Sequence, residues 1–265
     1  MDKAPIPASP AEPLLRHDED GIATLTLNRP RQYNALCRDL VCALERNLAA
    51  IAADPSVRVV IVTGAGAAFC AGHDLKEMRS LPAADVESLF GACSRAMQDL
   101  VALPQPVIAA VNGLATAAGC QLVAQCDLAV ASADARFAVS GINLGLFCST
   151  PAVALSRNLG RKRAAEMLFT GDFIDAGTAL DWGLVNRVCP ADRVAETARD
   201  LARRLVAKPR DSLALGKALF YRQLEQGLAG AYEDATRTIA CNFGAPAAIE
   251  GVTAFLEKRP PRWPD

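Results

Sequence analysis

The stretch CAGHDLKEM, residues 70–78, decides how this chain is interpreted. It follows the β-branched run VRVVIVTGAG, residues 57–66, which has the composition of a buried strand that stops at glycines. It places His73, one of only two histidines, directly before Asp74, where a helix is expected to begin. Free N–H groups at a helix start attract negative charge, and small residues let a ligand approach the backbone. The stretch is therefore predicted to be a turn that can hold an anion.

A second loop has the same construction. NGLATAAGCQL, residues 112–122, leaves the apolar run PVIAAVNG, residues 106–113, and enters a predicted helix through small residues at 116–119. Two such turns can aim two backbone N–H groups at one oxyanion, a geometry that contributes ~3–4 kcal/mol per donor. Taken alone, two Gly/Ala turns after strands are more often only tight turns. The loops by themselves do not establish a functional site.

Composition excludes several classes of protein. The chain has 265 residues, is 51% hydrophobic and carries a formal net charge of -1, so it can form one large domain or two smaller ones. A near-neutral charge with 5% aromatic residues argues against a nucleic-acid partner. Nine cysteines without a Cys-x-x-Cys pair, together with two histidines, give no metal site by spacing and indicate reduced thiols.

Targeting signals and membrane spans are also not expected. The N-terminus has no apolar signal region, and no run of about 18 uncharged apolar residues occurs. The sequence predicts a cytoplasmic protein with no membrane partner.

Strand-like and helix-like segments alternate along the first part of the chain, and helices dominate from about Arg161 onward. This order predicts an α/β core with a helical C-terminal part. The predicted divisions are a flexible tail at 1–13, a core at 14–200 and a C-terminal helical oligomerisation region at 201–265.

Four motifs together resemble one known family. FCAGHDLKEM and AVNGLATAAGCQLVAQCDLAVAS are similar to the signature of the enoyl-CoA hydratase/isomerase (crotonase) family. LNRPRQYNAL and FLEKRPPRW fit it as well, so the resemblance covers nearly the whole chain. NGLATAAGCQL and GLFCSTP are similar to its enoyl-CoA hydratase domain-containing protein 3 group. The resemblance implies a crotonase (ClpP-like) fold of stacked β-β-α units, with a C-terminal helical trimerisation region that forms trimers, often paired into hexamers.

The resemblance also implies a ligand and its contacts. The ligand is an acyl-CoA thioester whose carbonyl lies between the backbone N–H groups of His73 and Ala118, and no cofactor is implied beyond that coenzyme A. Position 73 then acts through its peptide, although a role for the His73 ring stays open. Arginine suits the CoA phosphates, although these positions also fit an exposed turn and helix. The candidate coenzyme contacts are Arg31, Gln32, Tyr33, Asp74, Leu75, Lys76 and Trp263.

The chain departs from the hydratase pattern at both catalytic glutamates. The two positions hold Gln121 and Gly141. An amide can orient water but cannot exchange a proton near neutral pH, and a general acid or base typically contributes 10²–10⁴-fold. Efficient hydration is therefore not expected.

Three alternatives remain open from the sequence. A decarboxylase of the methylmalonyl-CoA type needs the oxyanion hole but no base, with His73 near the departing carboxylate. A thioesterase would use Cys148, Ser149 or Thr150, for which no activating histidine is evident. A non-catalytic acyl-CoA-binding protein would need neither a nucleophile nor a group that transfers protons.

Overall fold

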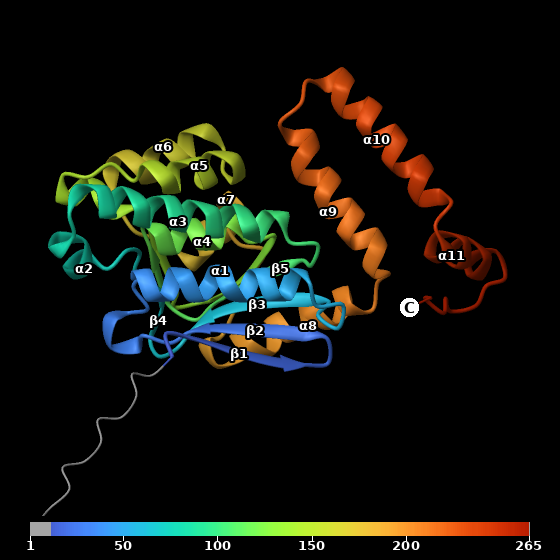
Figure 1. The fold of residues 1–265 in the computed structure, drawn as a ribbon, viewed down its shortest axis with the longest axis horizontal. Coiled ribbons are helices and arrows are strands. Elements are labelled where there is room, and N and C mark those ends of the chain that lie inside the picture. The colour runs from blue at the N-terminus through green and yellow to red at the C-terminus, as the bar shows by residue number, and fades with distance from the viewer. Residues whose placement is uncertain (1–11, 265) are drawn as a thin grey trace, which may run out of the picture.

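The computed structural model describes residues 12–264, whose strands form two sheets (Figure 1). The six-stranded sheet has the order β1-β2-β3-β5-β7-β10, in which only β1 runs antiparallel to its neighbour. The four-stranded sheet has the order β4-β6-β8-β9, in which only β9 is antiparallel. The strands are β1 Leu14–Glu19, β2 Ile22–Leu27, β3 Val59–Gly64, β4 Ala68–Cys70, β5 Val107–Val111, β6 Leu114–Thr116, β7 Leu128–Ser132, β8 Arg136–Ala138, β9 Ile174–Asp175 and β10 Arg187–Cys189.

Helices account for most of the remaining described chain. Short 3₁₀ turns are η1 Pro30–Gln32, η2 Ser140–Leu144 and η3 Ala191–Arg193. The α-helices are α1 Arg38–Ala52, α2 Leu75–Ser80, α3 Ala83–Ala102, α4 Ala118–Gln125, α5 Ser149–Asn158, α6 Arg161–Thr170, α7 Ala176–Trp182, α8 Val194–Val206, α9 Arg210–Leu224, α10 Leu228–Phe243 and α11 Pro246–Leu256. The tail predicted at 1–13 lies outside the described residues as far as residue 11.

The stacked β-β-α units predicted from the resemblance are present. In each unit the first strand joins the large sheet, the second joins the small sheet, and a helix follows. The three units are β3-β4-α2/α3, β5-β6-α4 and β7-β8-α5. Because consecutive units lie side by side in both sheets, the turns after β4 and after β6 are neighbours.

The central strands of the large sheet are buried on both faces. Along β3, Val60 and Val62 belong to the core that includes α1, α3 and α4, whereas Val59 and Ile61 pack against α8. This alternation is the period-2 arrangement of a strand covered on both sides, and it explains why β3 reads as a continuous apolar run.

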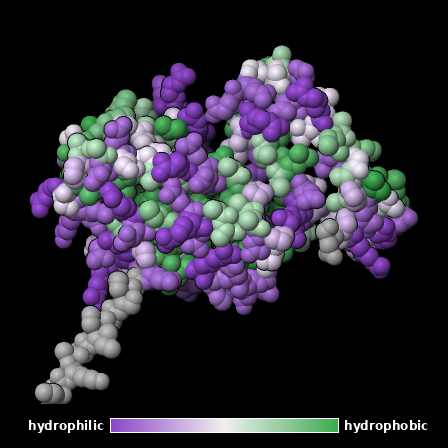
Figure 2. Space-filling model, viewed as in Figure 1, coloured by the Kyte–Doolittle hydropathy of each residue, from purple (hydrophilic) through white to green (hydrophobic). Residues whose placement is uncertain are grey.

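The last three helices, α9 to α11, project from this core as an arm (Figure 1). The boundary predicted after residue 200 falls inside α8, which lies against the large sheet, so the projecting part begins with α9. Hydrophobic residues appear among polar ones over the arm (Figure 2). Its large apolar side chains more than half exposed are Phe220, Leu224, Leu228, Tyr232, Ile239, Phe243, Ile249, Phe255 and Leu256.

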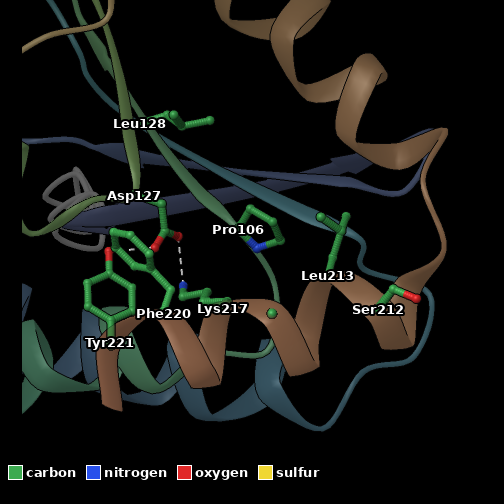
Figure 3. A pocket seen from close by; sticks show the side chains of 9 residues that line it. Pro106, Asp127, Leu128, Ser212, Leu213, Lys217, Phe220 and Tyr221 are labelled. Atoms are coloured by element: carbon green, nitrogen blue, oxygen red, sulfur yellow. Dashed lines mark hydrogen bonds and ion pairs between the residues drawn. The ribbon is translucent and has the colours of Figure 1, made fainter. Parts of the chain in front are cut away.

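A buried ion pair ties α9 to the core (Figure 3). Lys217 Nζ lies 2.7 Å from Asp127 Oδ2 and donates to the carbonyls of Leu100 and Gln105 at 2.8 and 3.0 Å. Tyr221 donates to the other Asp127 oxygen at 2.7 Å. These bonds hold the base of the arm in one position.

The same residues border a cavity of about 280 Å³. Pro106 and Asp127 in its wall immediately precede β5 and β7. The two loops that the sequence marks out come after their strands, so this cavity lies at the opposite edge of the sheet from them.

No single helix in the described part of the chain is long and apolar enough to cross a membrane. The consecutive helices α10 and α11 meet the length and composition test only as a pair, and they are bent by 72° at their junction.

Candidate active site

The two loops predicted to carry the donors touch each other. Gly72 has a φ of +84°, and a Cβ placed on it would lie 2.8 Å from Ala117 Cβ and 3.2 Å from Ala118 N. A side chain there would be strained and crowded, so glycine is needed for this approach. The structure thus places the turn that contains His73 directly against the amide of Ala118.

The amide of His73 points away from the segment that precedes α1. Leu36 N donates to Gly72 O at 2.7 Å, Asp74 N donates to Leu36 O at 3.0 Å, and Leu36 and His73 form a parallel bridge. In such a bridge the residues flanking His73 make the bonds, and the N–H of His73 itself faces the other side. Within residues 12–264 this N–H has no protein acceptor.

Ala118 supplies the second amide. It is the first residue of α4, so its N–H has no acceptor inside the helix, and none lies elsewhere in the described chain. Ala117 before it has φ 50° and ψ −121°, a backbone state that costs an alanine about 1–3 kcal/mol and needs support from its surroundings. Ala117 N donates to Ala138 O at 2.9 Å, which fixes this turn.

Close packing also fixes the position of α4. A Cβ on Gly119 would lie 2.0 Å from Cys70 O, so the helix start and the end of β4 meet at a distance that only glycine permits. The two free amides are therefore held in place by main-chain contacts. That they meet at one oxygen stays a prediction.

Both carboxylate oxygens of Asp74 accept hydrogen bonds from within the protein. Its Oδ1 accepts from the amides of Lys76 and Glu77 at 3.1 and 3.2 Å and caps α2, and its Oδ2 accepts from Arg29 at 2.9 Å. Burial acts to raise the pKa of Asp74, but these bonds outweigh it and lower the pKa. Asp74 is thus a helix-start carboxylate that anchors the loop. Its predicted contact with coenzyme A stays a prediction.

Sequence reasoning missed the residue that attaches the segment at residues 31–33, a predicted coenzyme contact, to the β3–β4 connection leading into this loop. Asn34 is completely buried with φ 56°, and its Nδ2 donates to the carbonyls of Ala65 and Ala68 at 2.9 and 2.8 Å. Its Oδ1 accepts from Arg29 N at 2.9 Å. The asparagine in LNRPRQYNAL was the available signal, because asparagine tolerates left-handed backbone and bonds to nearby main chain.

The predicted coenzyme contacts fall into two groups. Arg31, Gln32 and Tyr33 are exposed on and after η1, and Ala71 N donates to Tyr33 O at 3.0 Å, so this segment adjoins the first donor loop. Leu75 and Lys76 are exposed at the start of α2 beside it. Their contact with coenzyme A stays a prediction.

Trp263 lies elsewhere. Its indole N–H donates to Ala207 O at 3.0 Å and its ring packs on Gly251, so it joins the end of the chain to α8 and α11. Figure 1 shows this end of the molecule far from β4. Within one chain, Trp263 is not brought to the donor loops.

The ring of His73 packs edge-on against Phe90 of α3, with centroids 4.6 Å apart. Its Nε2 is buried and has no partner in the described structure. Burial lowers the pKa of His73 from its ordinary 6.5 to about 4, so the ring is neutral at pH 7.

His73 should make stability depend on pH. Its folded pKa lies below its unfolded pKa, so its contribution is present above pH 6.5 and is lost as pH falls toward 4. The loss amounts to about 3 kcal/mol. Urea unfolding at about pH 7, 5.5 and 4.5 should show this loss in the wild type and a shallower decline in His73→Asn. His17→Asn, which alters the exposed second histidine, is the control and should keep the full decline. Equal declines in wild type and His73→Asn would contradict the assignment.

The positions of the two absent glutamates differ in their surroundings. Gln121 lies one turn beyond Ala118, is 4% exposed, and its Oε1 has no partner within the described chain. A Cβ on Gly141 would lie 2.7 Å from Cys148 Sγ and 2.9 Å from Leu146 O. A glutamate at 141 would therefore require Cys148 to move.

The thiol that fills this space is not a ready nucleophile. Burial raises the pKa of Cys148, and the N–H of Gly141 offsets the rise only partly. The thiolate is the reactive form, so Cys148 is poorly suited to attack a thioester at neutral pH. Cys148, His73 and Gln121 are all uncharged at pH 7. No group of three or more His, Cys, Asp or Glu residues in the described chain is placed to bind a metal ion.

Comparisons with known proteins identify the family. Residues 17–265 match the family described as enoyl-CoA hydratase/isomerase. The enoyl-CoA hydratase domain-containing protein 3 of Rattus norvegicus is 44% identical over 97% of this chain and 87% of its own length. The crystal structure of an enoyl-CoA hydratase from Mycobacterium smegmatis is 56% identical, with a TM-score of 0.93 over 95% of this chain and 98% of that chain. The crystal structure of the human domain-containing protein 3 is 43% identical, with a TM-score of 0.91 over 95% and 100%.

One expectation from the sequence is contradicted. The predicted cytoplasmic location disagrees with the curated relatives of 43–44% identity, which are named mitochondrial proteins. The predicted crotonase fold and the predicted subgroup are confirmed, whereas trimerisation through the C-terminal helices stays a prediction. The stacked β-β-α units and the similarity over nearly the whole described length show that this chain belongs to the enoyl-CoA hydratase/isomerase family.

Proposed function

We propose that this protein binds an acyl-CoA thioester and polarises its carbonyl with the peptide N–H groups of His73 and Ala118. The observation that carries the proposal is the close approach of the two donor turns, where a Cβ added to Gly72 would lie only 3.2 Å from Ala118 N. Two preorganised donors stabilise the negative charge that develops on a thioester oxygen when an enolate forms.

The side chains around these donors limit which reactions the site can catalyse. Hydration requires a group that removes a proton from water and a group that delivers one to the α-carbon. Gln121 does neither, and the space at Gly141 is taken by Cys148. We therefore expect slow hydration. A thioesterase finds no support in the protonated Cys148 thiol, and a decarboxylase finds no cation among these side chains to hold its substrate's carboxylate.

The coenzyme is expected to lie along Arg31, Gln32 and Tyr33, with Lys76 near a phosphate, since these residues are exposed beside the first donor loop. The projecting arm supports assembly into a homotrimer or a pair of trimers, because its many exposed apolar side chains favour burial between copies. Trp263 would then reach a coenzyme only from a neighbouring copy.

A panel of thioesters tests the function. Calorimetry should show binding of butyryl-CoA and crotonyl-CoA, and mass spectrometry should show crotonyl-CoA hydration at least about 100-fold slower than in a family member with both glutamates. Methylmalonyl-CoA should yield no propionyl-CoA. Free coenzyme A is the control for binding through the coenzyme alone. Fast hydration would overturn the argument from the missing carboxylates, and failure to bind any thioester would overturn the proposal itself.

A further inference from the structure

The cavity at the base of the arm takes no part in the proposed function. It has a volume of about 280 Å³ and lies between α9 and the residues that precede β5 and β7, at the edge of the sheet away from the donor loops (Figure 3). Most of its wall is apolar and comes from Pro106, Leu128, Leu213, Phe220 and Tyr221. Apolar cavities of about 150 Å³ take up benzene, so this space is large enough for a molecule of about ten carbon atoms.

The charged groups in the wall have no capacity left for a ligand. Lys217 donates to Asp127 at 2.7 Å and to two backbone carbonyls at 2.8 and 3.0 Å, which uses all three of its hydrogens. Asp127 Oδ2 also accepts from Val107 N at 2.6 Å, and its Oδ1 accepts from the Tyr221 hydroxyl at 2.7 Å. A charged ligand would therefore find no available counter-charge in the described wall, and its desolvation would not be compensated.

Gly216 keeps one side of this cavity open. It lies near the middle of α9, it is exposed, and a Cβ added to it would meet no atom within 4 Å. Glycine destabilises the interior of a helix relative to alanine, and packing within the described chain does not require it at this position. The missing side chain thus leaves room in the cavity for an occupant that is not part of the fold.

We propose that this cavity is a second ligand site, which takes a small uncharged molecule with an aromatic or aliphatic body of about ten carbon atoms. The ligand contacts Leu213 and Phe220 on the arm and Pro106 and Leu128 on the core, so it joins α9 to the large sheet. Because such a ligand binds only the folded state, it stabilises the protein. The site is separate from the donor loops, so the inference does not depend on the proposed function.

Two probes test the site and its preference for an uncharged ligand. 2-Naphthol is uncharged, and its hydroxyl can face solvent on the open side of the cavity, whereas 2-naphthoate carries a carboxylate on the same ring system. By calorimetry 2-naphthol should saturate at one molecule per chain, and 2-naphthoate should bind at least about tenfold more weakly. Saturating butyryl-CoA should leave the affinity for 2-naphthol unchanged. 2-Naphthol should also raise the temperature of thermal unfolding.

Two matched variants place the binding at the cavity. Gly216→Leu fills the open space and should weaken 2-naphthol binding at least about tenfold, while butyryl-CoA binds as it does to the wild type. Gly230→Leu makes the same change at an exposed position of α10 outside the cavity wall, and it should bind 2-naphthol as the wild type does.

A wild type that does not bind 2-naphthol overturns the inference, whether or not the variants fold. Equal binding of 2-naphthoate, displacement by butyryl-CoA, or undiminished binding to Gly216→Leu does so as well. If light scattering shows that Gly216→Leu alone has lost oligomeric mass, the occupant of the cavity is a second copy of this chain and the ligand site is rejected.

Discussion

Replacing Ala118 with proline should reduce thioester turnover at least about 100-fold, or weaken thioester binding to a comparable extent, while the fold persists. Proline removes one of the two N–H donors. Position 118 is the first residue of α4, where proline is well tolerated because the N–H has no helical acceptor. Crotonyl-CoA hydration and butyryl-CoA calorimetry measure the loss, and circular dichroism follows the fold.

Two controls separate the donor from the side chain. Ala118→Gly keeps the amide and should stay within a few-fold of the wild type. Arg161→Pro places proline at the first position of the exposed start of α6 and should leave binding unchanged. A folded Ala118→Pro protein that binds and turns over thioesters normally would show that this amide does not hold the carbonyl.

Replacing Lys217 with methionine should cost about 3–5 kcal/mol of unfolding free energy, because it leaves the Asp127 carboxylate buried without its cation. The carbonyls of Leu100 and Gln105 would lose their donor as well. Urea unfolding at one fixed protein concentration measures the change, since assembly would make stability depend on concentration.

Arg157→Met is the matched control. It breaks the exposed pair of Arg157 with Glu225 and should change stability by less than about 1 kcal/mol. If Lys217→Met cost no more than Arg157→Met, the buried pair would not be what holds α9 to the core.

The sequence predicted well what depends on local pattern. The apolar run that became β3 and the two Gly/Ala turns marked the repeating unit. The family resemblance named His73 and Ala118, whose turns pack against each other in the structure, and their role as donors stays a prediction. Resemblance was needed because composition alone cannot distinguish a tight turn from a donor turn.

Contacts between distant segments could not be predicted. Asn34 bonds to carbonyls more than 30 residues away, and Lys217 reaches Asp127 across 90 residues. Cys148 occupies the space beside Gly141 because of the η2 turn, and such a short turn leaves no periodic pattern in the sequence. The cytoplasmic location was wrong because it rested on a missing signal, and the folded state carries no information about where a chain is delivered.

The strained backbone of Ala117 presents the Ala118 amide without the help of any side chain, and this bears on how such proteins acquire new reactions. If the backbone holds the carbonyl oxygen as proposed, substitutions of the nearby acid and base side chains leave that interaction unchanged. Proteins of this kind can therefore change the reaction that they catalyse while they keep the ability to bind the thioester carbonyl.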